Sequence, residues 1–340
     1  MTETVLVTGG TGFIAGWCIV ELLERGYNVR TTVRDRAKEE GVRSALARAN
    51  SKLPIDRLVF HVADLTRDAG WDAAVAGCDY VLHVASPLGG SVPGDRESFV
   101  APARDGTLRV LRAAVRARVR RVVMTSAAAA ARAPLRSTAT NDETIWADPT
   151  DPQFDDYRVS KILAERAAWD FMRDASGPTE FATILPGAVF GPLLMEENRG
   201  SVQIIQGLLD GRPPAMPRLG FWIVDVRDLA DMHIRAMTSA AAGGQRFIVS
   251  GDFMWMGEMA QTLRAELGDA AARVPTRRLP SFIVRLLVPF MPNLRPLAPL
   301  IGKRFPLTSE KARRVLGFSP RPVATTRAEC ARQLLSLRAA

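Results

Sequence analysis

The stretch TVLVTGGTGFIAGW, residues 4–17, decides the fold of this chain. A β-branched run leads through a glycine-rich turn into an apolar segment with helical spacing, and the turn fits the pattern G-x-x-G-x-x-A. Gly9 permits a turn that a side chain would block, Gly12 lets the backbone approach a pyrophosphate, and Ala15 leaves room for close helix–strand packing. The free N–H groups of the helix start favour a phosphate. These features predict a dinucleotide-binding turn made by Gly9, Thr11, Gly12, Phe13 and Ile14.

Short β-branched runs alternate with helical patterns through the first half of the chain, which predicts a parallel sheet with crossover helices. The expected strands are 4–9, 28–34, 58–64, 79–85, 121–126 and 181–187, and the clearest helices are 13–26 and 155–174. We expect an α/β fold: a Rossmann-type, doubly wound parallel sheet over residues 1–190, with returning segments at about 221–251. Residues 191–340 are expected to form mainly a smaller, irregular substrate-binding lobe.

The end of the second strand indicates which cofactor is preferred. An NAD-preferring protein normally has a carboxylate here for the ribose 2′-OH, but Val33 and Arg34 occupy this region. Arg34, with Arg36 or Lys38 as a second cation, can pair with a 2′-phosphate, so NADP(H) is predicted over NAD(H). Asp35 would reach the ribose if the strand ended one residue later. Asp64, after the third strand, is a candidate for the adenine amino group or a turn cap.

The motif YRVSK places Tyr157 and Lys161 four residues apart in an expected helix. This spacing puts both side chains on one face, where an ammonium group can lower the pKa of a phenol. Such a tyrosine can give its proton to a carbonyl oxygen. With only three tyrosines in the chain and few lysines, a chance pair is improbable.

Together, the glycine turn and Y-x-x-x-K resemble the extended short-chain dehydrogenases/reductases of the NAD-dependent epimerase/dehydratase family. The order VTGGTGFIAGW, VLHVASP, YRVSK, LPGAVFGP and VDVRDLADMH is most similar to the dihydroflavonol-reductase-like group. The resemblance implies that Tyr157 is the general acid and that Lys161 also binds the nicotinamide ribose. It further implies nicotinamide contacts after the fourth and sixth strands, by Val84, Ala85, Ser86, Pro186 and Val189. Asp64 and Leu65, after the third strand, are also predicted to contact the cofactor.

The segment TSAAAAAR, residues 125–132, departs from this family pattern. Family members usually have TSS here, and the second serine hydrogen-bonds the substrate carbonyl; Ala127 stands at that position. Ser126 is predicted to take over as a catalytic hydroxyl, and Thr125 is the poorer candidate because neighbouring strand residues point to opposite faces. The alternative is that the hydroxyl is lost. Arg132 matches an asparagine that contacts the flavonoid in plant dihydroflavonol reductases, so it faces either an anionic group or solvent.

The composition limits partners and location. The net charge of +9 comes from arginines scattered along the chain, so we expect neither nucleic acid nor membrane as a partner. Three distant cysteines, Cys18, Cys78 and Cys330, suggest buried thiols and no metal site. No targeting segment is recognised, so a cytoplasmic protein acting on a small molecule, as a monomer or homodimer, is expected.

Three functions remain open from the sequence. The leading hypothesis is an NADPH-dependent reductase of an aldehyde or ketone, or the reverse alcohol oxidation. The second is a nucleotide-sugar epimerase or dehydratase with tightly held NAD, which Arg34 disfavours. The third is a cofactor-sensing protein with impaired catalysis, which Ala127 favours and the Tyr157/Lys161 pair disfavours.

Overall fold

The computed structural model describes residues 2–87, 95–195, 200–288, 290 and 298–339. The strands in these ranges are β1 (Thr4–Val7), β2 (Asn28–Val33), β3 (Leu58–Val62), β4 (Tyr80–His83), β5 (Arg121–Thr125), β6 (Glu180–Pro186), β7 (Ala188–Phe190), β8 (Met216–Pro217), β9 (Gly220–Asp225), β10 (Gln245–Val249), β11 (Phe253–Trp255) and β12 (Arg278–Leu279). The α-helices are α1 (Phe13–Glu24), α2 (Glu39–Ala49), α3 (Trp71–Val75), α4 (Glu97–Arg116), α5 (Asp156–Asp174), α6 (Val202–Leu209), α7 (Val226–Thr238), α8 (Met256–Leu267), α9 (Ser281–Leu287), α10 (Glu310–Leu316) and α11 (Val323–Ala339).

The main sheet has seven parallel strands in the order β10-β6-β5-β4-β1-β2-β3. The chain first moves from β1 through β2 to β3, then crosses back to place β4 on the other side of β1. In such sheets a ligand binds beyond the carboxyl ends of the strands, where the winding direction reverses. The predicted Rossmann-type fold is confirmed, and its reversal point lies between β1 and β4.

Helices cover both faces of this sheet because its strands are apolar on both sides. On one face, α1 and α7 pack against each other, and α2 and α10 contribute to the same apolar cluster. On the other face, α3, α4 and α5 pack together. The sheet is therefore a rigid support whose carboxyl edge stays open for a site.

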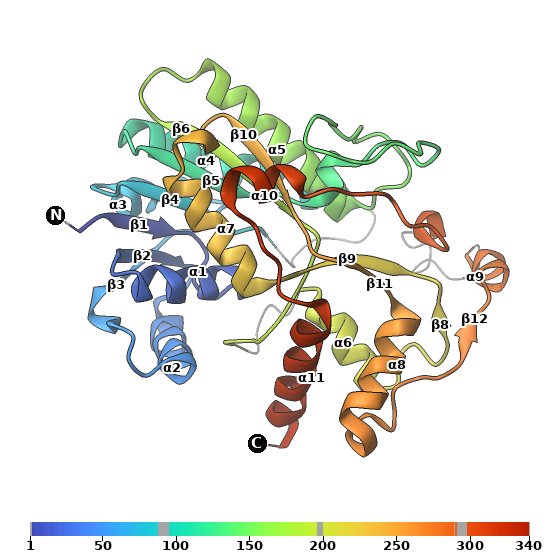
Figure 1. Ribbon diagram of the computed structural model, residues 1–340. Helices are drawn as coiled ribbons and strands as arrows, with labels where there is room; N and C mark the ends of the chain where they lie inside the picture. The colour runs from blue at the N-terminus through green and yellow to red at the C-terminus, as the bar shows by residue number, and fades with distance from the viewer. Residues whose placement is uncertain (1, 88–94, 196–199, 289, 291–297, 340) are drawn as a thin grey trace.

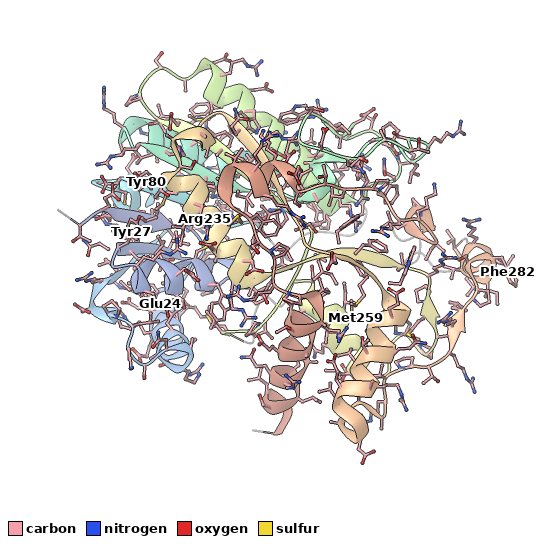
Figure 2. The ribbon with its side chains drawn as sticks, in the orientation of Figure 1. Glu24, Tyr27, Tyr80, Arg235, Met259 and Phe282 are labelled. Carbon is pink, nitrogen blue, oxygen red and sulfur yellow. The ribbon has the colours of Figure 1, made fainter. Side chains whose placement is uncertain are left out.

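A second lobe is built around a three-stranded sheet in the order β11-β9-β7. Figure 1 shows this lobe to the right of the main sheet, with α6, α8, α9 and α11 around it. Figure 2 labels Met259, which is buried on α8, and Phe282, which is exposed at the outer edge of the lobe.

The segment after residue 220 divides between the two lobes. Its first strand, β9, joins the second sheet, whereas α7 packs on α1 and β10 extends the main sheet beside β6. The division of the chain at residue 190 into cofactor and substrate lobes stays a prediction.

The three cysteines are free and buried, as expected. Burial raises the pKa of the Cys78 and Cys330 thiols to about 11. In the described ranges, His, Cys, Asp and Glu side chains form no group of three or more that could hold a metal ion. Every helix of these ranges is too short or too polar to span a lipid bilayer.

Candidate active site at the carboxyl edge of the main sheet

The turn between β1 and α1 forms a cradle of backbone atoms. Gly9 has a φ of +76°, and a Cβ atom there would lie 3.0 Å from the Cβ of Ala85, so a side chain has no room. The N–H of Gly9 donates to Thr32 Oγ1 and the N–H of Gly10 donates to Thr32 O, each at a distance of 2.9 Å. These two hydrogen bonds attach the turn to β2. Gly12 precedes α1, whose first turn has no side-chain cap and no acidic residue. The uncapped helix start fits a pyrophosphate.

A buried Thr8–His83 pair holds the end of β4 against this turn, and the sequence did not suggest it. Thr8 Oγ1 accepts hydrogen bonds from the N–H groups of Val84 and Ala85, over 3.1 and 2.9 Å. Its own proton is then available for His83 Nδ1, 3.1 Å away, which leaves His83 Nε2 to donate to Thr107. Burial, and secondarily Lys161, lowers the pKa of His83 to about 3. A neutral histidine thus positions the predicted cofactor contacts Val84, Ala85 and Ser86.

A cavity of about 290 Å³ lies beyond the ends of β2 and β3, where a Rossmann fold receives the adenosine half of its cofactor. Arg34, Asp64 and Arg67 line it. The pKa of Asp64 is lowered by hydrogen bonds from Thr66, with further contributions from the two arginines. Arg67 was missed because it lies in a turn without a motif.

The other residues predicted to contact the adenosine half of the cofactor lie outside this cavity. Asp35 follows the end of β2 and accepts a hydrogen bond from the N–H of Ala37, so it caps the next turn. Lys38 lies in that turn and is not among the described residues that line the cavity. Leu65 packs its side chain against Gly106 of α4. Arg34 is therefore the predicted cation that borders the cavity.

Tyr157 and Lys161 lie in the first turns of α5, which begins after the cap formed by Asp155. Lys161 is buried, and its Nζ lies 3.5 Å from the backbone oxygen of Thr125 at the end of β5. Tyr157 keeps an exposed fraction of 39%. The pair thus combines a shielded cation with a partly exposed tyrosine at the carboxyl edge of the sheet.

The pKa values of this pair correct one expectation. Burial raises the pKa of Tyr157, and the neighbouring charges that act on it are Arg158 and Asp155. Lys161 was expected to lower that pKa, but it is not among those charges. Burial instead lowers the pKa of Lys161 to about 8, opposed by the charge of Glu165. In the protein without ligands, the phenol therefore keeps its proton.

The Ser126 hydroxyl is turned into a buried network in this structure, and its predicted catalytic role stays a prediction. Its side chain is buried, and Oγ donates to Glu165 Oε2 over 2.6 Å. Glu165 also accepts from Thr183 and from Arg246, so it anchors a buried network. Because a hydroxyl has a single proton to donate, Ser126 has none left for a substrate carbonyl in this arrangement. The structure favours the alternative that the hydroxyl is lost at Ala127.

The hydroxyl of Thr125 is also hydrogen-bonded within the fold. His233 Nδ1 lies 2.8 Å from the backbone oxygen of Leu229, so this nitrogen carries the proton. His233 Nε2 is then an acceptor for the Thr125 hydroxyl, 2.7 Å away. No hydroxyl at the end of β5 is therefore available to a substrate.

The remaining predicted cofactor contacts also lie near this edge. Pro186 ends β6, and Val189 is a buried residue of β7, in the second sheet. Between them, a Cβ at Gly187 would lie 2.3 Å from the backbone oxygen of Trp222. Only glycine lets β9 approach here, which joins the two lobes beside the site.

The buried ammonium of Lys161 should give the unfolding free energy a specific pH dependence. Its pKa is about 8 in the folded chain and near the ordinary 10.5 when unfolded. The unfolded state therefore binds more protons between these values, so stability rises with pH across this window. Urea unfolding measures the free energy of unfolding of the wild type and of Lys161→Met. From about pH 8 to pH 10, the stability of the wild type is expected to increase relative to that of the variant. A difference independent of pH would contradict the burial of the ammonium group.

Comparison with known proteins agrees with this geometry. Residues 5–250 match the model of the NAD dependent epimerase/dehydratase family. A dihydroflavonol 4-reductase of Dianthus caryophyllus is 35% identical over 81% of this chain and 76% of its own length. Cinnamoyl-CoA reductase CAD2 of Medicago truncatula is 36% identical over 73% and 76%.

A solved structure is similar over the whole fold. Yeast methylglyoxal/isovaleraldehyde reductase Gre2, complexed with NADPH, superposes with a TM-score of 0.79 at 26% identity, covering 99% of each chain. The chain belongs to the NAD-dependent epimerase/dehydratase family of extended short-chain dehydrogenases/reductases, in its dihydroflavonol-reductase-like branch, and is an NAD(P)-dependent oxidoreductase.

Proposed function

We propose that the protein is an NADPH-dependent reductase of an aldehyde or ketone, or catalyses the reverse alcohol oxidation. The observation that carries this proposal is the accessible Tyr157 above the buried Lys161, at the edge where the glycine turn ends. The relatives are named as reductases, which supports the same reaction class.

The chain's own residues would divide the chemistry as follows. A bound nicotinamide cofactor supplies the hydride. Tyr157 gives its phenolic proton to the carbonyl oxygen as that oxygen gains charge, which is general acid catalysis. Lys161 binds the nicotinamide ribose with its buried ammonium group. Because Ala127 offers no hydroxyl, Tyr157 is the side-chain donor to the carbonyl.

The residues around the expected cofactor fit NADP(H). The glycine turn leaves backbone N–H groups at the start of α1 for a pyrophosphate. Arg34 and Arg67 border the cavity beside Asp64, and the charges of both help to lower the pKa of its carboxyl group. Two guanidinium groups beside a single carboxylate favour a ribose 2′-phosphate over a free 2′-OH. We therefore propose NADP(H) in preference to NAD(H).

Arg34→Ala is expected to weaken NADPH binding by about 10- to 100-fold, because a charge-assisted hydrogen bond to a phosphate is lost. NADH binding should change little, since NADH lacks this phosphate. Arg48→Ala is the matched control, because Arg48 is exposed in the last turn of α2 and does not line the cavity. Fluorescence titrations of the wild type and both variants with each cofactor measure the six dissociation constants. Equal affinities of the wild type for NADPH and NADH would show that Arg34 does not select the cofactor.

The reaction itself is tested by following NADPH consumption with a panel of aldehydes and ketones and identifying the alcohols formed. A nucleotide-sugar epimerase would instead be purified with bound NAD and consume no NADPH. The cofactor-sensing alternative draws support from Ala127 and from the committed Ser126 hydroxyl. That alternative predicts NADPH binding without turnover of any carbonyl compound.

The proposed setting follows from the same chemistry. The three cysteines remain unpaired, as is usual in a reducing compartment such as the cytoplasm. The proposed partner is a small carbonyl or alcohol substrate, bound by a monomer or a homodimer. Sedimentation velocity of the purified protein distinguishes these two states.

A further inference from the structure

Arg132 is a cation without a counterion, and it follows η3 (Ala128–Ala131) at the carboxyl edge of the main sheet. Its Nη1 atom is buried and has no hydrogen-bond partner in the described part of the chain. No carboxylate of that part forms a salt bridge with it. Burial, together with the charge of Arg158, lowers the pKa of Arg132 to about 10. An unneutralised guanidinium in such surroundings is costly unless a ligand supplies the missing charge.

Two aromatic rings hold this guanidinium in place. Its Cζ lies 5.8 Å from the ring centre of Phe154 and 4.8 Å from that of Phe305. The backbone oxygen of Phe305 accepts a hydrogen bond from Trp222 Nε1 over 2.7 Å. Trp222 belongs to β9, the strand that approaches Gly187. Arg132 therefore lies where the main sheet meets the second lobe.

The same two charges connect Arg132 with Tyr157. Arg132 lies over the ring of Phe154, which directly precedes Asp155, the cap of the helix that carries Tyr157. Arg158 and Asp155 also act on the pKa of both groups. The charge of Asp155 acts on Arg132 from a distance, but its carboxylate accepts hydrogen bonds from Arg158 and caps α5. The Arg132 guanidinium thus stays unpaired close to the proposed proton donor.

We propose that Arg132 binds a carboxylate of the substrate, so that the substrate is a carbonyl compound with a second, anionic end. This inference rests on the proposed reductase function and names its substrate class. A planar guanidinium matches a carboxylate with two parallel hydrogen bonds. A phosphate dianion would need a second free cation, and the neighbouring Arg158 is already paired with Asp155.

The kinetic test uses two aldehydes that carry a carboxylate, terephthalaldehydic acid and succinic semialdehyde. Each is compared with its own methyl ester. The wild type should show a higher kcat/KM for the acids, and Arg132→Gln should lower the acid-to-ester ratio by about 10- to 100-fold, mainly through KM. Arg132→Lys should retain part of the preference, because it keeps the charge but not the planar fork. The matched control is Arg136→Gln, at an exposed arginine four residues away, which should keep the wild-type ratio.

A binding measurement separates this inference from the proposed function. Calorimetry on the protein saturated with NADP⁺ compares benzoate with benzamide and needs no turnover. We expect benzoate to bind more tightly in the wild type and in Arg136→Gln, and the difference to disappear in Arg132→Gln. If no carbonyl compound is reduced but this pattern appears, the reductase function fails and the anion site stands. If esters and acids react equally, or the preference survives Arg132→Gln, the anion site is wrong.

Discussion

Tyr157→Phe is expected to lower kcat by about 10²- to 10⁴-fold, the range over which general acid catalysis usually contributes. The substitution removes the transferable proton but keeps the ring, so NADPH affinity should stay near that of wild type. Because burial raises the pKa of Tyr157, the phenol holds its proton at neutral pH and is ready to donate it. Steady-state kinetics on an accepted carbonyl substrate, with a cofactor titration, measure both quantities.

Tyr27→Phe is the matched control, because it removes the same hydroxyl elsewhere in the fold. Tyr27 directly precedes β2, at the amino end of that strand and far from the carboxyl edge, and Figure 2 labels it beside Tyr80. The control variant should keep wild-type turnover. If Tyr157→Phe also turned over at nearly the wild-type rate, Tyr157 would not be the proton donor.

Ala127→Ser is expected to raise kcat by up to about 10²-fold, since one donor aimed at a developing oxyanion contributes that much in other enzymes. Ala127 directly follows β5 in an extended conformation, and its φ of −152° suits serine equally well. The substitution would restore the hydroxyl that neither Thr125 nor Ser126 can supply. Comparing kcat of wild type and variant on one substrate is the measurement.

Ser126→Ala is the companion variant and should affect stability more than rate. Loss of its hydroxyl leaves the buried Glu165 with one donor fewer, which is expected to cost about 1–3 kcal/mol of unfolding free energy. A loss of about 10²-fold in kcat with unchanged stability would instead show that the Ser126 hydroxyl is catalytic. Ser126 would then turn toward the substrate during the reaction, and the assignment of the lost hydroxyl to Ala127 would be wrong.

Local sequence patterns predicted most of the fold because they record local physical requirements. Gly9 needs a positive φ, and α1 needs a start without a side-chain cap. The glycine turn can therefore be predicted from the local sequence alone. Strand ends came within one or two residues of their predicted places, since buried parallel strands are nearly continuous apolar runs. The position of Arg34 after β2 followed from the same regularity.

Other features depend on partners that are distant in the chain and have no local signal. The hydroxyl of Ser126 is bound by Glu165, 39 residues later. His83 meets Thr8 across 75 residues. The pKa of Lys161 follows from its burial against β5. Within the segment predicted to return to the main sheet, β10 does so, whereas β9 pairs with β7. Tertiary contacts decide such features, so the sequence supplied candidates and the fold selected among them.

We propose that this protein transfers a hydride from NADPH to a carbonyl carbon while Tyr157 supplies the proton. The most direct measurement uses NADPH deuterated at the transferable position, with mass spectrometry and NMR of the product. We predict an alcohol with deuterium on the former carbonyl carbon, formed by the wild type and lost in Tyr157→Phe. A product without deuterium, or deuterium transfer that persists at the wild-type rate in Tyr157→Phe, would contradict the account.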